Sequence, residues 1–271
     1  MPESEAVWMQ RQFIVAQTET DDDLRARWQT LAAEVAKLPA VQPDADPQPL
    51  SGEAMVVATE ITAGEVFQQL FGAGPHDFRS VRIDGLLTAQ TNVDVGFGDE
   101  LDAQLARAAS EAEVLRFCMR ANPIEAPLVG ADGLVTFSSH YAQNLSATQM
   151  RIEEVSPTEV RIYASIISRP NYVQVVQFAG RYVLANGYHR AVALKRAGHD
   201  RMPCMVRPPV PTLLALQFQP PHFFSDHQMQ QPRPPMVVDF LNDELTVPLD
   251  ARGKSHIMRA GLQIQAFEAP R

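Results

Sequence analysis

Residues 181–199 read RYVLANGYHRAVALKRAGH, and this stretch decides the fold prediction. Its first five residues are typical of a buried strand, and Tyr188–Ala197 has the pattern of a helix that Gly198 ends. Asn186 and Gly187 join the two segments, and a glycine at such a corner adopts backbone conformations that a side chain would block. The sequence therefore predicts a strand that runs directly into a helix.

The helix after Gly187 is expected to offer an anion-binding N-terminus. The amides of Tyr188, His189 and Arg190 fall in its first turn, where backbone N–H groups favour an anion such as phosphate. Arg190 adds a planar guanidinium that suits phosphate oxygens, and His189 adds a further donor. The alternative is a structural corner, in which Tyr188 and His189 cap the helix and Arg190 pairs with an acidic side chain of residues 1–150.

The neighbouring residues predict two more strands. Tyr172–Phe178 is expected to turn at Ala179-Gly180 into the strand Arg181–Ala185, and Met202–Arg207 is expected to be the next strand. Strand, helix and strand in this order predict a right-handed crossover unit. The residues Val183, Leu184, Ala191, Val192 and Leu194 are predicted to be core.

Residues 156–168 fit two predictions. Ser156-Pro157-Thr158-Glu159 has the form of a capping box, which favours a helix. Val160, Ile162, Ala164 and Ile166 alternate with polar residues, which favours a strand. The helix is preferred.

The rest of the chain predicts a mixture of helices and strands. Residues 21–38 are expected to form a helix capped by Thr20, and residues 39–50, with four prolines, an extended linker. The further expected elements are a strand at Ala54–Ala58, a helix at Ala63–Phe71, a strand at Ser80–Leu87, a helix at Asp99–Arg120, a hairpin at Leu128–Phe137 around Ala131-Asp132-Gly133, and a strand pair at 245–268 that turns at Arg252-Gly253.

Composition and charge narrow the class of protein. The 271 residues are 45% hydrophobic and 20% charged, which indicates a folded core, and the net charge of −9 disfavours non-specific binding to DNA or anionic membranes. Residues 1–150 hold 9 basic and 22 acidic residues, whereas residues 151–210 hold 9 basic and 4 acidic. The basic segment suits a local anion site, or it pairs with the acidic first half. The acidic N-terminus without an apolar segment and the two cysteines, Cys118 and Cys204, predict a cytoplasmic protein without a disulfide framework.

The segment Arg181–Val206 resembles the core of the ParB/sulfiredoxin-like superfamily. That core has a strand, a Gly-x-x-Arg box, a helix that ends near a glycine, and a strand that begins near a proline, and here the box is Gly187-Tyr188-His189-Arg190. Pro170 and Val173–Val176 resemble the family's preceding segment. The resemblance implies an α+β fold with this core, and the patterns of the remaining chain add an N-terminal helical arm and a C-terminal strand-rich extension. The chain is expected to divide into four parts. They are a helical arm with a proline-rich linker (1–50), a mixed α/β segment (51–155), the ParB/sulfiredoxin-like core (156–208), and a proline-rich segment with a C-terminal hairpin (209–271).

The resemblance also implies that the box binds nucleotide phosphates, from CTP or ATP, with or without Mg²⁺. Gly187, Tyr188, His189 and Arg190 are the matching residues. Outside the box, Arg169 is a candidate second phosphate contact or a surface arginine, and Ser165 is a candidate pocket residue or an ordinary serine before a proline turn. Tyr188 stands where the reductase members carry a reactive cysteine, so reductase chemistry is not expected.

Two candidates are named for chemistry beside the phosphates. Asp84 is a candidate general base or Mg²⁺ ligand, or it simply opens the turn with Gly85. His189 is the candidate catalytic residue within the box.

Three functions stay open at this point. The leading one is an NTP- or phosphate-binding protein, with NTPase or phosphotransferase activity as a further option. The second is a scaffold for protein assembly through residues 1–50 and 208–235, with homo-oligomers as an option. The third is a nucleotide-gated DNA-associated protein, disfavoured by the acidic charge and by the proline-rich residues 208–271, where a helix-turn-helix reader is not expected.

Two other polar groups are weak candidates. His222 and His227 flank Phe-Phe-Ser-Asp but lack an evident third metal ligand. Ser138-Ser139-His140 lies on an expected strand, where adjacent side chains face opposite ways.

Overall fold

The computed structural model describes residues 3–13, 20–94, 109–120, 128–130, 135–139, 145–168, 170–218, 222–247 and 256–260. The chain divides into two compact units. Unit 1 is Met1–Arg120 with Tyr172–Arg252, and unit 2 is Ala121–Asn171 with Gly253–Arg271. Residues 156–171 of the predicted core segment therefore belong to unit 2.

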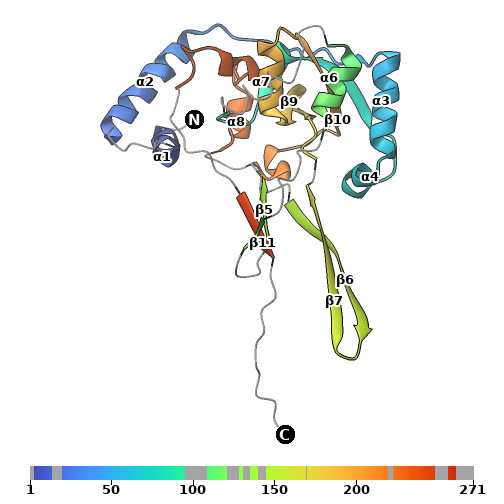
Figure 1. Ribbon diagram of the computed structural model, residues 1–271. Helices are drawn as coiled ribbons and strands as arrows, with labels where there is room; N and C mark the ends of the chain where they lie inside the picture. The colour runs from blue at the N-terminus through green and yellow to red at the C-terminus, as the bar shows by residue number, and fades with distance from the viewer. Residues whose placement is uncertain are drawn as a thin grey trace. The chain divides into compact units, whose positions relative to one another are not determined.

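Unit 1 is built on a six-stranded mixed sheet, with helices beside it (Figure 1), so the fold belongs to the α+β class. The strand order is β1-β2-β10-β8-β9-β3. The bounds are β1 Gln48–Pro49, β2 Asp77–Arg82, β3 Leu87–Thr88, β8 Gln174–Phe178, β9 Arg181–Asn186 and β10 Arg201–Arg207. The predicted strands at Tyr172–Phe178, Arg181–Ala185 and Met202–Arg207 are confirmed.

The pairing of these strands corrects the predicted crossover. β8 and β9 form an antiparallel hairpin, and β10 pairs with β8 in parallel. β8 therefore lies between β9 and β10, and those two strands run in opposite directions. The parallel connection runs from β8 to β10 through β9 and the helix α7 (Tyr188–Arg196), which confirms the predicted helix before Gly198.

Alternation along the central strands gives the sheet two buried faces. Val175 and Leu184 belong to a hydrophobic cluster that includes residues of the helices α3 (Gly52–Ala63), α6 (Glu111–Cys118) and α7. Val176 and Val183 point to the opposite face, into a second cluster. All five residues predicted as core around Gly187 are buried, which confirms that prediction.

The second face is covered by the proline-rich part of the chain. Its cluster contains Leu213, Met229 and Met236, from the short helices η3 (Leu213–Leu216) and α8 (Asp226–Met229) and the residue before η4 (Val237–Leu241). Backbone hydrogen bonds join Phe224 N to Ala89 O and Val210 N to Gln177 O. Residues 208–235, expected to contact a partner, thus pack against their own chain.

The expected strand at Ala54–Ala58 is wrong, because this segment lies within helix α3. Ser51 caps the helix by accepting a hydrogen bond from Ala54 N. Ala54, Val57 and Ala58 are buried, whereas Met55 and Val56 are exposed, and this is the spacing of one helix face. A five-residue apolar run is too short to distinguish the two structures by local pattern.

The other expected elements of the first half are shorter than expected. Helix α4 spans Glu65–Phe71 within the predicted range, and the predicted strand at Ser80–Leu87 is divided into β2, the turn η1 (Ile83–Gly85) and β3. A continuous helix over Asp99–Arg120 is wrong, because Ser110 is the extended N-cap of α6. Residues 99–108 lie outside the described residues.

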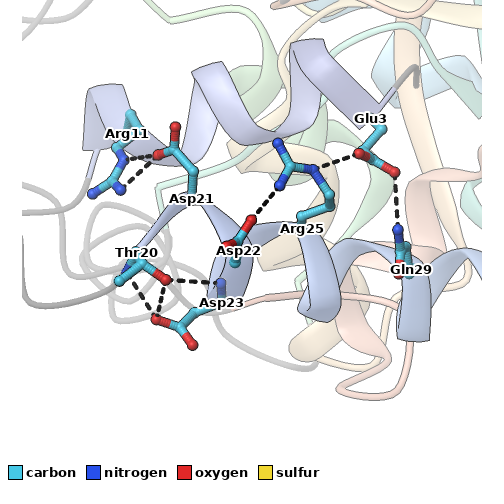
Figure 2. Close-up of polar contacts among 8 residues, drawn as sticks. All are labelled: Glu3, Arg11, Thr20, Asp21, Asp22, Asp23, Arg25 and Gln29. Carbon is cyan, nitrogen blue, oxygen red and sulfur yellow. Dashed lines mark hydrogen bonds and ion pairs between the residues drawn. The ribbon is translucent and has the colours of Figure 1, made fainter.

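The N-terminal arm is a pair of helices, α1 (Glu3–Phe13) and α2 (Asp21–Lys37). Figure 2 shows that the pair is joined by polar contacts, in which Arg25 binds Glu3 at 2.7 Å and Arg11 binds Asp21 at 2.6 Å. Thr20 caps α2 through Asp23 N, as predicted. Leu24 is the buried residue of α2.

The predicted linker, residues 39–50, is extended and bound to unit 1. Val41 N donates to Pro232 O, Arg82 N donates to Ala45 O, and β1 pairs with β2. Gly85 lets the linker pass closely, since a Cβ at Gly85 would lie 1.9 Å from Asp44 O.

Unit 2 contains a long hairpin, β6 (Leu145–Ser156) with β7 (Glu159–Ser168), and a sheet of order β11-β5-β4. The preferred helix at 156–168 is therefore wrong: Pro157 and Thr158 lie in the turn, and the alternating residues lie on a strand. β4 (Leu128–Val129) pairs with β5 (Val135–Ser139), which confirms that hairpin, and its turn at 131–133 lies outside the described residues.

At the C-terminal end, β11 (His256–Ala260) pairs with β5. The predicted turn at Arg252-Gly253 lies outside the described residues. Long-range pairing of this kind leaves no local signal in the sequence.

Candidate functional site

The corner between β9 and α7 is built around Gly187. Its backbone is left-handed, with φ 96° and ψ 24°, and it is the N-cap residue of α7. A Cβ at this position would lie 2.6 Å from Val173 Cγ2. The predicted need for glycine is therefore confirmed on two grounds, the backbone conformation and the closeness of Val173. Asn186 Oδ1 accepts a hydrogen bond of 2.8 Å from Gly187 N, which fixes the corner.

Tyr188, the first residue of α7, turns its side chain into the core. The ring is buried, and its hydroxyl donates to Leu184 O at 2.5 Å. Burial raises the pKa of this phenol well above its usual range. The part of Tyr188 suited to an anion site is therefore its backbone amide.

His189 lies against the residues that follow β3. Its Nε2 accepts a hydrogen bond of 2.9 Å from Asp94 N. Burial lowers the pKa of His189, the Asp94 carboxylate raises it, and Arg190 lowers it, with a net shift downward. The ring is therefore neutral at pH 7, with its proton on Nδ1, and it acts at Nε2 as an acceptor.

Arg190 was expected to face an anion, and its guanidinium contacts the C-terminal end of α6. Nη1 donates to Cys118 O at 3.0 Å and Nη2 donates to Arg120 O at 3.2 Å, and the residue is 4% exposed. The α6 terminus presents carbonyl oxygens that a cation stabilises. Arg190 thus joins the end of one helix to the beginning of another.

Arg120 is a residue of this region that sequence reasoning did not single out. Its backbone oxygen binds Arg190, and its guanidinium lies 5.1 Å from the centre of the Phe117 ring. Partial burial lowers the pKa of Arg120. The sequence held no signal for this placement, because Arg120 and Arg190 are 70 residues apart and meet only through the fold.

Asp84 lies away from the Gly187 corner. Its carboxylate binds Arg82 at 2.9 Å, and the neighbouring Ile83 N donates to Asp200 O, beyond the C-terminal end of α7. Gly187 is at the other end of this helix, whose nine residues span about 13 Å. The structure gives no contact between Asp84 and the corner among the described residues.

The two remaining predicted contacts belong to unit 2. Ser165 lies on β7, opposite Thr148 of β6. Arg169 lies outside the described residues. The structure therefore brings together Gly187, Tyr188, His189 and Arg190, with Asp94 and Arg120 as new neighbours.

The described residues contain no group of three His, Cys, Asp or Glu arranged to hold a metal ion. His222 contacts the Trp8 ring edge-on, with centroids 6.1 Å apart, and His227 Nε2 lies 2.8 Å from Gln231 Nε2. Within the same residues, no helix combines the length and the apolar character needed to cross a bilayer.

Comparison of the chain with protein-family models, with curated proteins and with solved structures gives no match.

Proposed function

We propose that the first turn of α7 binds a phosphate group of a nucleoside triphosphate. The observation that carries the proposal is the Gly187 corner: a left-handed glycine opens α7 directly from a strand, and no described side chain caps the helix there. First-turn amides of this kind bind phosphate in nucleotide-binding loops. The resemblance of this box to the ParB/sulfiredoxin-like core, and to its CTP- or ATP-binding members, supports the same conclusion.

Each residue of the corner has a role in this proposal. The backbone amides of the first turn of α7 bind phosphate oxygens, and the His189 side chain lies beside them. Arg190 acts as a positioning residue, because its bonds to Cys118 O and Arg120 O hold the helix start in place while its buried charge favours an anion nearby. The proposal is for binding, and it assigns no chemical step.

Asp94 is the acidic group that suits a Mg²⁺ ion accompanying the nucleotide. Its carboxylate lies near enough to raise the pKa of His189, and carboxylate oxygens are the ligands that Mg²⁺ prefers. In this proposal Asp94→Asn weakens binding of the Mg²⁺ complex and leaves binding of the metal-free nucleotide unchanged.

Calorimetric titration of the full chain with CTP and ATP, with and without Mg²⁺, tests the proposal. The decisive variant is His189→Glu, which places a carboxylate in the first turn, where it suits the helix dipole but excludes phosphate. Binding is expected to fall at least about ten-fold, the equivalent of one lost charge-assisted hydrogen bond, when measured at a temperature at which circular dichroism shows the variant to be folded.

The matched control is Arg196→Gln, which also changes the charge by −1 but at the last turn of α7. It is expected to bind nucleotide as the wild type does. Absence of NTP binding in the wild type, or equal affinity in His189→Glu, would reject the proposal.

A further inference from the structure

The β6–β7 hairpin of unit 2 is a sheet of only two strands, with 12 and 10 residues. Ile152 lies opposite Ile162, Glu153 opposite Arg161, and Arg151 opposite Tyr163. No described strand pairs with the outer edge of β6 or of β7. A two-stranded hairpin is marginal in water, and an open edge is a template for pairing with another strand.

One face of this hairpin carries a cluster of exposed aliphatic side chains. Ile152, Val160 and Ile162 share a face, because they are two residues apart or directly opposite. Their exposed fractions are 64%, 56% and 47%. Adjacent large aliphatic side chains with this exposure mark an interaction surface rather than a solvated strand.

The edge of β6 has a charge pattern that is complementary to itself. Arg151 and Glu153 flank Ile152, and neither forms an ion pair with another described residue. When two antiparallel copies of such a strand meet about a two-fold axis at Ile152, each Arg151 lies opposite Glu153 of the partner subunit. The symmetry makes this contact twice.

We propose that the outer edge of β6 pairs with the same edge of a second copy of this chain. The pairing gives a four-stranded antiparallel sheet in which Ile152 meets Ile152 of the partner subunit, and the apolar faces of the two hairpins become continuous. Two cross-strand ion pairs and a central isoleucine pair stabilise it, and three or more strands form a more stable sheet than two.

The β7 edge is less suited to this role. Its charged residues Glu159 and Arg161 already bind each other at 3.0 Å, and Pro157 stands in the turn at its start. The charge of the hairpin also disfavours nucleic acid and anionic lipid as occupants. Residues 145–168 hold two arginines and three glutamates, a balance of −1, within a chain of net charge −9.

Sedimentation of the full chain over a wide concentration range tests the proposal through charge reversal. The single variants Arg151→Glu and Glu153→Arg each oppose like charges twice at the interface, and each is expected to raise the dimer dissociation constant about ten-fold or more. The double variant Arg151→Glu with Glu153→Arg restores both pairs and is expected to restore the dimer. A wild type that stays monomeric, or a double variant no better than the singles, would overturn the proposal.

Cross-linking tests the register independently. Cys118 and Cys204 are buried, so a cysteine introduced on the hairpin is the reactive thiol. Ile152→Cys lies on the two-fold axis and is expected to give a disulfide-linked dimer on mild oxidation.

Ile162→Cys is the matched control, because in the paired sheet it is three strand spacings, about 14 Å, from its copy. Cross-linking through position 162 and not through position 152 would show that the hairpins meet by another edge or face, and would reject the pairing proposed here.

Discussion

Arg190 and Cys118 are joined by a hydrogen bond of 3.0 Å from the Arg190 guanidinium to the Cys118 carbonyl oxygen, across 72 residues of sequence. Because Arg190 also binds Arg120 O, its side chain connects the first turn of α7 to the last turn of α6. A residue expected from the sequence to face an anion thus has a structural contact in the fold.

Arg190→Ala is expected to lower the free energy of unfolding by about 2–4 kcal/mol, because it leaves buried carbonyl oxygens without their charged donor. Arg190→Lys keeps the charge but loses the two-pronged geometry, so it is expected to recover part of this loss. Urea denaturation without nucleotide measures both variants. An alanine variant as stable as the wild type would mean that these two bonds contribute nothing to the fold.

Gly187→Ala is expected to destabilise the protein by about 2–4 kcal/mol. The alanine is strained at φ 96°, and its Cβ meets Val173 Cγ2 at 2.6 Å. Gly198→Ala is the matched control: its φ is 90°, but no atom lies within 4 Å of the added Cβ, so only the backbone strain of about 1 kcal/mol is expected. Equal losses in thermal denaturation would show that Val173 moves aside without cost.

The two cysteines are expected to make stability fall at alkaline pH. Burial raises the pKa of Cys118 to about 12 and that of Cys204 well above its usual value. In the unfolded chain a thiol ionises near pH 8.5, whereas these two thiols stay neutral in the folded protein. Ionisation therefore stabilises the unfolded state as the pH rises above about 8.5. The free energy of unfolding is constant below that pH and falls above it by up to about 1.4 kcal/mol per pH unit for each thiol.

Urea denaturation between about pH 8 and pH 10 measures this slope. The reference is the variant Cys118→Ala with Cys204→Ala, which is less stable overall but lacks the two thiol contributions, so its slope is expected to be shallower. The native protein is also expected to react slowly with thiol reagents, and rapid labelling of either cysteine would contradict the burial.

In the N-terminal arm, Leu24→Ala is expected to lower the stability of the folded arm more than Arg25→Ala does. Leu24 is fully buried, and its truncation costs about 2–5 kcal/mol. Arg25 binds Glu3 and Asp22, but its side chain is 42% exposed, and exposed ion pairs contribute about 1 kcal/mol or less. Hydrogen exchange of the α2 amides in each variant measures the local loss, and the reverse order would show that ion pairs hold the arm.

Local sequence determined the segment around Gly187. The strand, the glycine corner, the helix ended by Gly198 and the buried residues Val183 and Leu194 are all as predicted. Each depends on interactions within about ten residues: alternation along a strand, helical periodicity, and the freedom of glycine at positive φ. The cap of α2 at Thr20 was predictable for the same reason.

Only the tertiary structure decided the features in which distant segments meet. Residues 54–58 and 159–168 have apolar patterns compatible with both helix and strand, and packing selected a helix for the first and a long hairpin partner for the second. Two features depend on contacts between residues that are tens of positions apart in the sequence. They are the position of β10 beside β8 and the contact of Arg190 with α6. A local sequence pattern shows which side chains share a face, but which element, if any, covers that face is decided by the whole fold.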